Sequence, residues 1–280
     1  MIIDFHTHVF PAFFRNDRSA AILHDPAFKI LYASPQAKLA GVQALIRHMD
    51  QAGVQRSVIF GFPWEDPDYF KRHNDYILES VNRYPDRLSG FCTFAPVSPS
   101  GPTEVERCLR QGLSGVGELA VYGSDLSRKV IEILGDVMVL CREADVPFLL
   151  HVNEPVGHHY PGKTPNTLRQ VYDFVKAFPE NRIVLAHWGG GLLFYALMKR
   201  EVKAVLRQVW FDTAASPYLY TPDIYRVAGE IVGFEKILFG SDYPLLTPER
   251  YFKEMVEAGL TEENRVRIKG QNAAQLLDLG

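Results

Sequence analysis

Two histidines lie two residues apart near the start of the chain, in the stretch "MIIDFHTHVF". Side chains on a β-strand alternate between its two faces, so His6 and His8 point to the same side while Thr7 points away. Two neutral imidazoles that converge on one point supply half of a metal site. The same pair on an exposed strand would be an accident of sequence, so the rest of the chain has to decide between these interpretations.

Four further polar residues come directly after apolar runs: Glu118 after VG, His151 after FLL, His187 after VLA and Asp242 after LFGS. Taken alone, each has a simple structural explanation, such as a hydrogen-bonded histidine or a turn-forming aspartate. Six such residues at the same relative place on five predicted strands are not readily arranged by chance. Nitrogen and carboxylate donors suit a divalent ion such as zinc, which is our expectation, with a position left open for water. The predicted ligands are His6, His8, Glu118, His151, His187 and Asp242.

The elements that position these residues repeat along the chain. Apolar runs predict strands at 2–9, 57–62, 88–96, 114–122, 147–155, 182–190, 209–216 and 236–244. Amphipathic stretches predict helices at 34–53, 66–85, 126–145, 164–181, 221–233 and 247–259. Strands that are apolar throughout and alternate with helices are typical of a parallel sheet covered on both faces. The eight strands predict an α/β fold, a distorted (β/α)8 TIM barrel, as a single domain over residues 1–280 with its site at the C-terminal ends of the strands.

A long irregular segment, residues 10–33, separates the first strand from its helix and carries five aromatic residues. We expect it to lie over the barrel mouth as a lid or one wall of a pocket, although exposed aromatics there would equally serve an interface in a homo-oligomer. His48 and His73 fall in predicted helices and are expected at the surface. Substrate contacts are predicted at Trp188, Tyr243, His158 and Asn153.

The composition is that of an ordinary soluble protein. Hydrophobic residues make up 47% of the 280 residues, charged residues 22%, and the formal net charge is −3, which gives no support to nucleic-acid binding. The three cysteines form no CxxC pair. Neither a signal peptide nor an apolar run of about 18 residues is evident. We therefore expect a cytoplasmic protein that acts on a small molecule and binds neither nucleic acid nor membrane.

Several motifs resemble the amidohydrolase superfamily and, within it, the amidohydrolase 2 group. They are "DFHTH", "MDQAGVQRSVIF", "NRYPDRLSGFCTFAP", "FLLHVNEP", "VLAHWGGG", "KILFGSDYP" and "GQNAAQLL", and they cover nearly the whole chain. The resemblance implies a metal-dependent TIM-barrel enzyme. It also implies that four histidines and Asp242 match the family's metal and catalytic positions. Glu118 stands where members with two metals carry a bridging carboxylated lysine or glutamate, so the chain resembles the glutamate-bridged kind.

Hydrolysis is our first expectation. Glu118 would bridge two ions, one held by the two histidines of strand 2–9 with Asp242 and the other by His151 and His187. A water activated by the ions would attack an ester, lactone or amide, and Asp242 would carry its proton to the leaving group.

Two alternatives stay open. A single zinc on the first two histidines, His151 and Asp242 would leave His187 free to protonate a substrate, and an unsaturated or aromatic acid would then lose carbon dioxide. This decarboxylase interpretation needs a cation for the substrate carboxylate, and Lys163 or Arg250 would have to serve. The other alternative is a barrel that binds a ligand without chemistry, although a complete ligand set argues against it.

Overall fold

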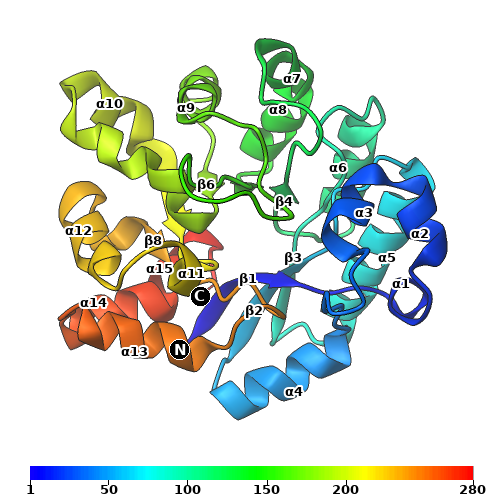
Figure 1. The fold of residues 1–280 in the computed structure, drawn as a ribbon, viewed down its shortest axis with the longest axis horizontal. Helices are drawn as coiled ribbons and strands as arrows, with labels where there is room; N and C mark the ends of the chain where they lie inside the picture. The colour runs from blue at the N-terminus through cyan, green and yellow to red at the C-terminus, as the bar shows by residue number, and fades with distance from the viewer. Residues whose placement is uncertain (280) are drawn as a thin grey trace.

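Eight parallel strands form the centre of the molecule, and helices surround them as an outer ring (Figure 1). The computed structural model describes residues 1–279. The strands are β1 Ile3–His8, β2 Arg56–Phe60, β3 Leu88–Gly90, β4 Val116–Leu119, β5 Phe148–Leu150, β6 Ile183–Leu185, β7 Val209–Asp212 and β8 Ile237–Leu238. Each overlaps a predicted run, so the prediction of an α/β barrel is confirmed.

The barrel closes through two short seams. Strands β1 to β3 pair in order, as do β4 to β8. Parallel bridges from Cys92 to Val116 and from Thr7 to Tyr243 join the two sheets. The pairing register shifts inside β1 and inside β4, the strands that carry the first histidines and Glu118. Gly117 allows the shift in β4, because a Cβ on it would lie 2.2 Å from the Leu149 carbonyl oxygen.

The outer ring follows the predicted order of helices with several differences at the boundaries. Its helices are α4 Val42–Ala52, α5 Pro67–Arg83, α6 Gly101–Arg110, α7 Arg128–Ile133, α8 Gly135–Glu143, α9 Leu168–Ala177, α10 Arg200–Val205, α11 Ser216–Leu219, α12 Asp223–Val232, α13 Pro248–Glu257, α14 Glu262–Val266 and α15 Asn272–Leu276. The helix predicted over 34–53 begins only after Gly41, and the one predicted over 126–145 is divided at Leu134. None of the described helices is long and apolar enough to cross a membrane.

The segment predicted as irregular, residues 10–33, instead folds into three short helices. They are α1 Ala12–Asn16, α2 Ser19–His24 and α3 Pro26–Tyr32. Phe14 and Phe28 are buried, and the Phe14 ring stacks on Trp64 with ring centroids 4.3 Å apart. The buried aromatics are therefore occupied within the chain and are not an exposed interface. Asp25 caps α3, since its Oδ1 accepts a hydrogen bond of 2.8 Å from the Phe28 N–H.

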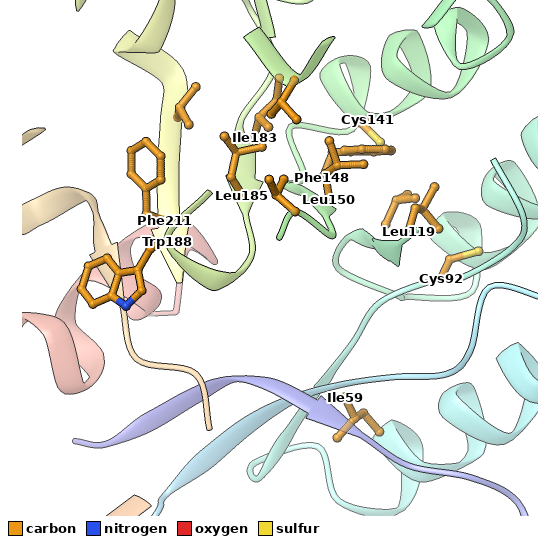
Figure 2. Close-up of a cluster of buried hydrophobic side chains, with 14 of the residues drawn as sticks. Ile59, Cys92, Leu119, Cys141, Phe148, Leu150, Ile183, Leu185, Trp188 and Phe211 are labelled. Atoms are coloured by element: carbon orange, nitrogen blue, oxygen red, sulfur yellow. The ribbon is translucent and has the colours of Figure 1, made fainter. Parts of the chain in front are cut away.

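The main core lies between the strands and the surrounding helices (Figure 2). Leu150, Leu185 and Phe211 project from neighbouring strands into it and are essentially inaccessible to solvent. Burying a side chain of this size contributes about 1.5–3 kcal/mol relative to leaving it exposed. This packed layer holds the strands rigidly, so the residues at their C-terminal ends have fixed positions.

Candidate metal centre

The six predicted ligands converge at the C-terminal mouth of the barrel. The donor atoms of five of them form two overlapping groups in which all members lie within 4.8 Å of one another, His6–His8–Glu118 and Glu118–His151–His187. The carboxylate shared by the two groups comes from β4, and the four histidines come from β1 and from the ends of β5 and β6. The sequence prediction of these positions thus corresponds to a real cluster of side chains.

Glu118 lies at the centre of the cluster. Its Oε2 is 3.6 Å from Nε2 of both His6 and His8, while its Oε1 is 2.8 Å from His151 Nδ1 and 3.4 Å from His187 Nε2. Asp242 belongs to the first side of the cluster, because its Oδ1 lies 3.6 Å and 3.4 Å from the two β1 histidines. The carboxylate of Glu118 therefore faces both groups of nitrogens.

Two of these residues are held by an unusual backbone. His187 and Asp242 adopt left-handed conformations, with φ of 56° and 59°. Such conformations cost about 1–3 kcal/mol for residues other than glycine and concentrate at functional sites. After β6 the left-handed turn continues through Trp188 to Gly191. It directs the His187 side chain to the mouth, and the next side chain into the core.

Asp212, at the end of β7, is a site residue that our sequence analysis missed. Its Oδ2 accepts a hydrogen bond of 2.8 Å from His6 Nδ1, and its Oδ1 accepts from the N–H groups of His187 (2.9 Å) and Ala214 (3.0 Å). The side chain is completely buried. The run "VWFD" carries the same signal as the other strand ends, an acid after apolar residues, and would have identified it.

Hydrogen bonds behind the histidines determine which nitrogen faces the centre. The Nδ1–H of His6 donates to Asp212, and the Nδ1–H of His187 donates to the Ala214 carbonyl at 2.9 Å. The Nε2–H of His151 donates to the Gly162 carbonyl at 3.1 Å. When these rings are neutral, each inward nitrogen carries a lone pair, as do the carboxylate oxygens. Acceptors that converge without a matching donor fit a bound cation, and backing hydrogen bonds of this kind are usual for metal-ligating histidines.

The charges in the cluster shift its pKa values strongly. Burial lowers the pKa of His187, but the hydrogen bond and negative charge of Glu118 outweigh it and raise the value to about 9. Burial raises the pKa of Asp242, yet the hydrogen bond from His8 and the charge of His6 lower it to about 2. Protons and a divalent ion therefore compete for the same lone pairs, and the carboxylates stay charged at neutral pH.

Of the four predicted substrate contacts, Trp188 is wrong because it belongs to the core, and the other three stay predictions. Trp188 is fully buried, and its indole N–H donates to Ser216 Oγ at 2.9 Å, so this residue belongs to the core (Figure 2). A strand-end aromatic looks the same in the sequence whether it packs inward or lines a pocket. Asn153 Oδ1 accepts from Thr164 N–H at 2.8 Å and fastens the loop after β5. His158 is exposed in that loop, and Tyr243 stacks on His48 at 4.7 Å.

Neither cation that the decarboxylase interpretation requires is free. Lys163 Nζ lies 2.8 Å from Glu154 Oε1 and donates to the Val156 carbonyl at 2.6 Å. Arg250 donates to the Pro217 carbonyl at 2.9 Å, and its guanidinium lies 5.3 Å from the Tyr218 ring centroid. Both cations thus already have partners within the described residues, and pairing of one of them with a substrate carboxylate stays a prediction.

An eight-stranded α/β barrel with nitrogen and carboxylate donors gathered at its mouth defines a class of barrel proteins with a candidate metal site. The chain belongs to the amidohydrolase family, whose model matches residues 3–279.

Similar proteins include several decarboxylases. A gamma-resorcylate decarboxylase from Polaromonas sp. strain JS666 is 25% identical over 253 residues, which cover 75% of this chain and 76% of that protein. The structure of 5-carboxyvanillate decarboxylase from Sphingomonas paucimobilis matches with a TM-score of 0.79 and 18% identity, over 100% of this chain and 99% of that one. A dihydroxybenzoic acid decarboxylase from Polaromonas sp. JS666, solved with manganese and the inhibitor 2-nitroresorcinol, matches with a TM-score of 0.71 and 18% identity, over 99% and 97%. These structural matches confirm the barrel fold.

Proposed function

We propose that this protein is a metal-dependent decarboxylase that releases carbon dioxide from a hydroxylated aromatic acid. The observation that carries the proposal is the complete donor cluster around Glu118, in a chain similar over three quarters of its length to a gamma-resorcylate decarboxylase. Hydrolysis, our first expectation, has less support because the similar proteins described above are decarboxylases.

The donor cluster fits a divalent ion. His6, His8, Glu118 and Asp242 would hold it, and their nitrogen and oxygen donors suit manganese as well as zinc. Zinc was our expectation, whereas manganese is the ion present in the similar dihydroxybenzoic acid decarboxylase. When bound, such an ion acts as a Lewis acid toward oxygen atoms of the substrate.

Residues that do not hold the ion provide the proton that decarboxylation requires. Loss of carbon dioxide from an aromatic carboxylate breaks one carbon–carbon bond, and the ring carbon must take up one proton in its place. An ion on the other residues would leave His187 free to take up a proton on Nε2, since in the metal-free cluster its pKa is raised to about 9 and its Nδ1–H is fixed on the Ala214 carbonyl. The negative charge of Asp242 helps to keep that proton in place. His187 is thus positioned to donate a proton to the ring carbon.

A hydrolase that uses two ions is the second candidate. The observation that favours it is the position of Glu118, which belongs to both donor groups and so stands where a bridging ligand would stand. Two ions per chain together with hydrolysis of a lactone would support this candidate over the decarboxylase.

The proposal is tested with protein loaded with manganese, and separately with zinc. We expect carbon dioxide and the corresponding phenol to form from 2,6-dihydroxybenzoate or 2-hydroxybenzoate, and the His187→Gln variant to retain its metal but lose this activity. Metal-loaded protein that releases no carbon dioxide from hydroxybenzoates, yet hydrolyses lactones, would overturn the proposal.

A further inference from the structure

Three aromatic side chains line one side of the mouth, and we call Tyr32, Phe62 and Tyr122 the tyrosine wall. The ring centroids of Tyr32 and Phe62 lie 5.9 Å apart, and those of Phe62 and Tyr122 lie 6.0 Å apart with the rings nearly parallel at 7°. Tyr122 continues to the candidate metal centre, since its ring centroid is 6.1 Å from that of His151. The wall therefore extends from α3 to one of the candidate ligands.

The two hydroxyl groups of the wall have no partner within the described residues 1–279. No hydrogen bond joins Tyr32 or Tyr122 to another side chain or carbonyl there, and neither oxygen is among the fully buried unpartnered atoms. Tyr160 differs, because its hydroxyl donates to Glu154 Oε2 at 2.8 Å. Two phenols beside the charged cluster are thus available to donate hydrogen bonds.

Both phenols are protonated at neutral pH, since even an unperturbed tyrosine has a pKa of about 10. Burial raises the pKa of Tyr32, and the negative charges of Asp242 and Glu118 raise it further. Burial likewise raises the pKa of Tyr122, with Glu118 again contributing. These charges place both hydroxyls in the field of the metal-binding carboxylates. At neutral pH each hydroxyl is therefore a hydrogen-bond donor.

The segment that carries Tyr32 is fastened to the barrel. Asp25 caps α3 through Oδ1, and its Oδ2 accepts from the Glu65 N–H at 3.0 Å, which ties the helix to the loop after β2. At the other end of α3, Arg18 donates to the Tyr32 carbonyl at 3.1 Å. Because these contacts hold the backbone, the wall is formed before any ligand binds, which lowers the cost of ordering it.

We propose that the tyrosine wall binds the ring of an aromatic acid, and that Tyr32 and Tyr122 donate hydrogen bonds to an oxygen substituent on that ring. Aromatic rings favour offset or edge contacts with a planar ligand. Two donors without partners discriminate against a ligand that offers no acceptor, because they then stay unpaired when water is excluded. The choice of ligand rests on the proposed function, but binding to the wall is measured without turnover.

The test compares the binding of benzoate and 2-hydroxybenzoate, which differ by one hydroxyl, to manganese-loaded protein by calorimetry. We expect Tyr122→Phe and Tyr32→Phe each to weaken binding of 2-hydroxybenzoate by roughly 3- to 10-fold, with benzoate binding unchanged. Tyr172→Phe is the matched control, since Tyr172 is half-buried on α9 beside Tyr195 and should alter neither ligand. Manganese content and thermal unfolding of each variant are measured in parallel.

Equal weakening of both ligands, or no weakening of either, would overturn the role of the hydroxyls. If one variant does not fold, the other still decides, because each hydroxyl should strengthen the binding of 2-hydroxybenzoate and not that of benzoate. Selective weakening in protein that releases no carbon dioxide would support the wall while contradicting the proposed decarboxylase. Failure of the wall and failure of the proposed function are therefore distinguishable.

Discussion

Two buried clusters in this protein hold the side-chain types that bind metals, yet they differ in what surrounds them. One is the mouth cluster around Glu118, and the other consists of Glu104 and Cys108, both on α6, together with Cys92. Glu104 accepts hydrogen bonds from Arg107 at 2.8 and 2.7 Å and from Asn74 at 2.9 Å. Glu118 has only imidazoles as neighbours in its short polar contacts.

The ionisation of the two clusters differs in the same way. Burial raises the pKa of the Cys92 thiol well above its usual range, so the sulfur stays protonated and is a poor metal ligand. Burial also raises the pKa of Glu104, but the hydrogen bonds from Arg107 and Asn74 outweigh it and lower the value. The negative charge of a carboxylate that is paired with an arginine is already compensated, so the carboxylate does not require a metal cation. A metal site is therefore not defined by the types of donor side chain alone. It also requires acceptor atoms around a carboxylate that lack hydrogen-bond donors.

The largest expected effect comes from neutralising the central carboxylate of the mouth. Glu118→Gln removes the charge that both donor groups share, so we expect manganese affinity to fall by more than about 100-fold and carbon dioxide release to disappear with it. Calorimetric titration of metal-free protein measures the affinity. Unchanged metal binding in this variant would mean that the carboxylate of Glu118 does not hold the ion.

The corresponding change in the second cluster should affect folding and leave metal binding intact. Glu104→Gln removes one of the two carboxylates that hold the partly buried Arg107, the other being Asp75 at 2.7 Å, and we expect the free energy of unfolding to fall by about 2–3 kcal/mol. Urea denaturation measures the loss, with manganese affinity as the internal control. A loss of metal from this variant would mean that the two clusters are not separate.

A third buried group, His73, differs from the histidines of the mouth because its imidazole is neutral and both of its ring nitrogens have hydrogen-bond partners. Its Nδ1 accepts from the Trp64 indole at 3.0 Å, its Nε2 donates to the Val9 carbonyl at 2.7 Å, and burial lowers its pKa to about 4. In the unfolded chain the imidazole of His73 is protonated below about pH 6.5, whereas in the folded chain it is protonated only below about pH 4. Stability is therefore lost as the pH falls through this range, by about 3 kcal/mol at pH 4.

Chemical denaturation of metal-free protein at several pH values tests this contribution. The control is His73→Gln, which offers an acceptor and a donor in similar places but does not titrate. The difference in pH dependence between the two proteins isolates His73 from the acidic groups of the mouth. Identical slopes between pH 6.5 and pH 4 would contradict a neutral buried imidazole.

The smallest expected effect concerns the aspartate behind the mouth. Asp212→Asn keeps the shape of the side chain but weakens its hold on the His6 ring, so we expect metal affinity to fall by about 10- to 100-fold. Calorimetric titration, with Asp173→Asn as an exposed control, measures this loss. Affinity equal to that of the wild type would show that Asp212 only supports the backbone of the β6 and β7 ends.

The parts of this architecture that depend on local pattern were predictable from the sequence. Strand runs and candidate ligands at strand ends, such as Glu118, follow from apolar periodicity and from polar residues that interrupt it. Trp188 was placed incorrectly because the left-handed turn after β6 reverses the alternation expected of a strand. His73 was expected at the surface because its burial depends on the helices of residues 10–33, which pack against Trp64. The tyrosine wall combines three distant segments, so no local signal reveals it.

We expect the mouth cluster to hold a divalent ion and the cysteine-containing cluster to hold none. Elemental mass spectrometry on protein purified without chelator tests it most directly. We predict about one manganese or zinc ion per chain, retained in Glu104→Gln and absent in Glu118→Gln. Protein that stays free of metal after manganese and zinc are supplied, or that loses its metal equally in both variants, would contradict the account.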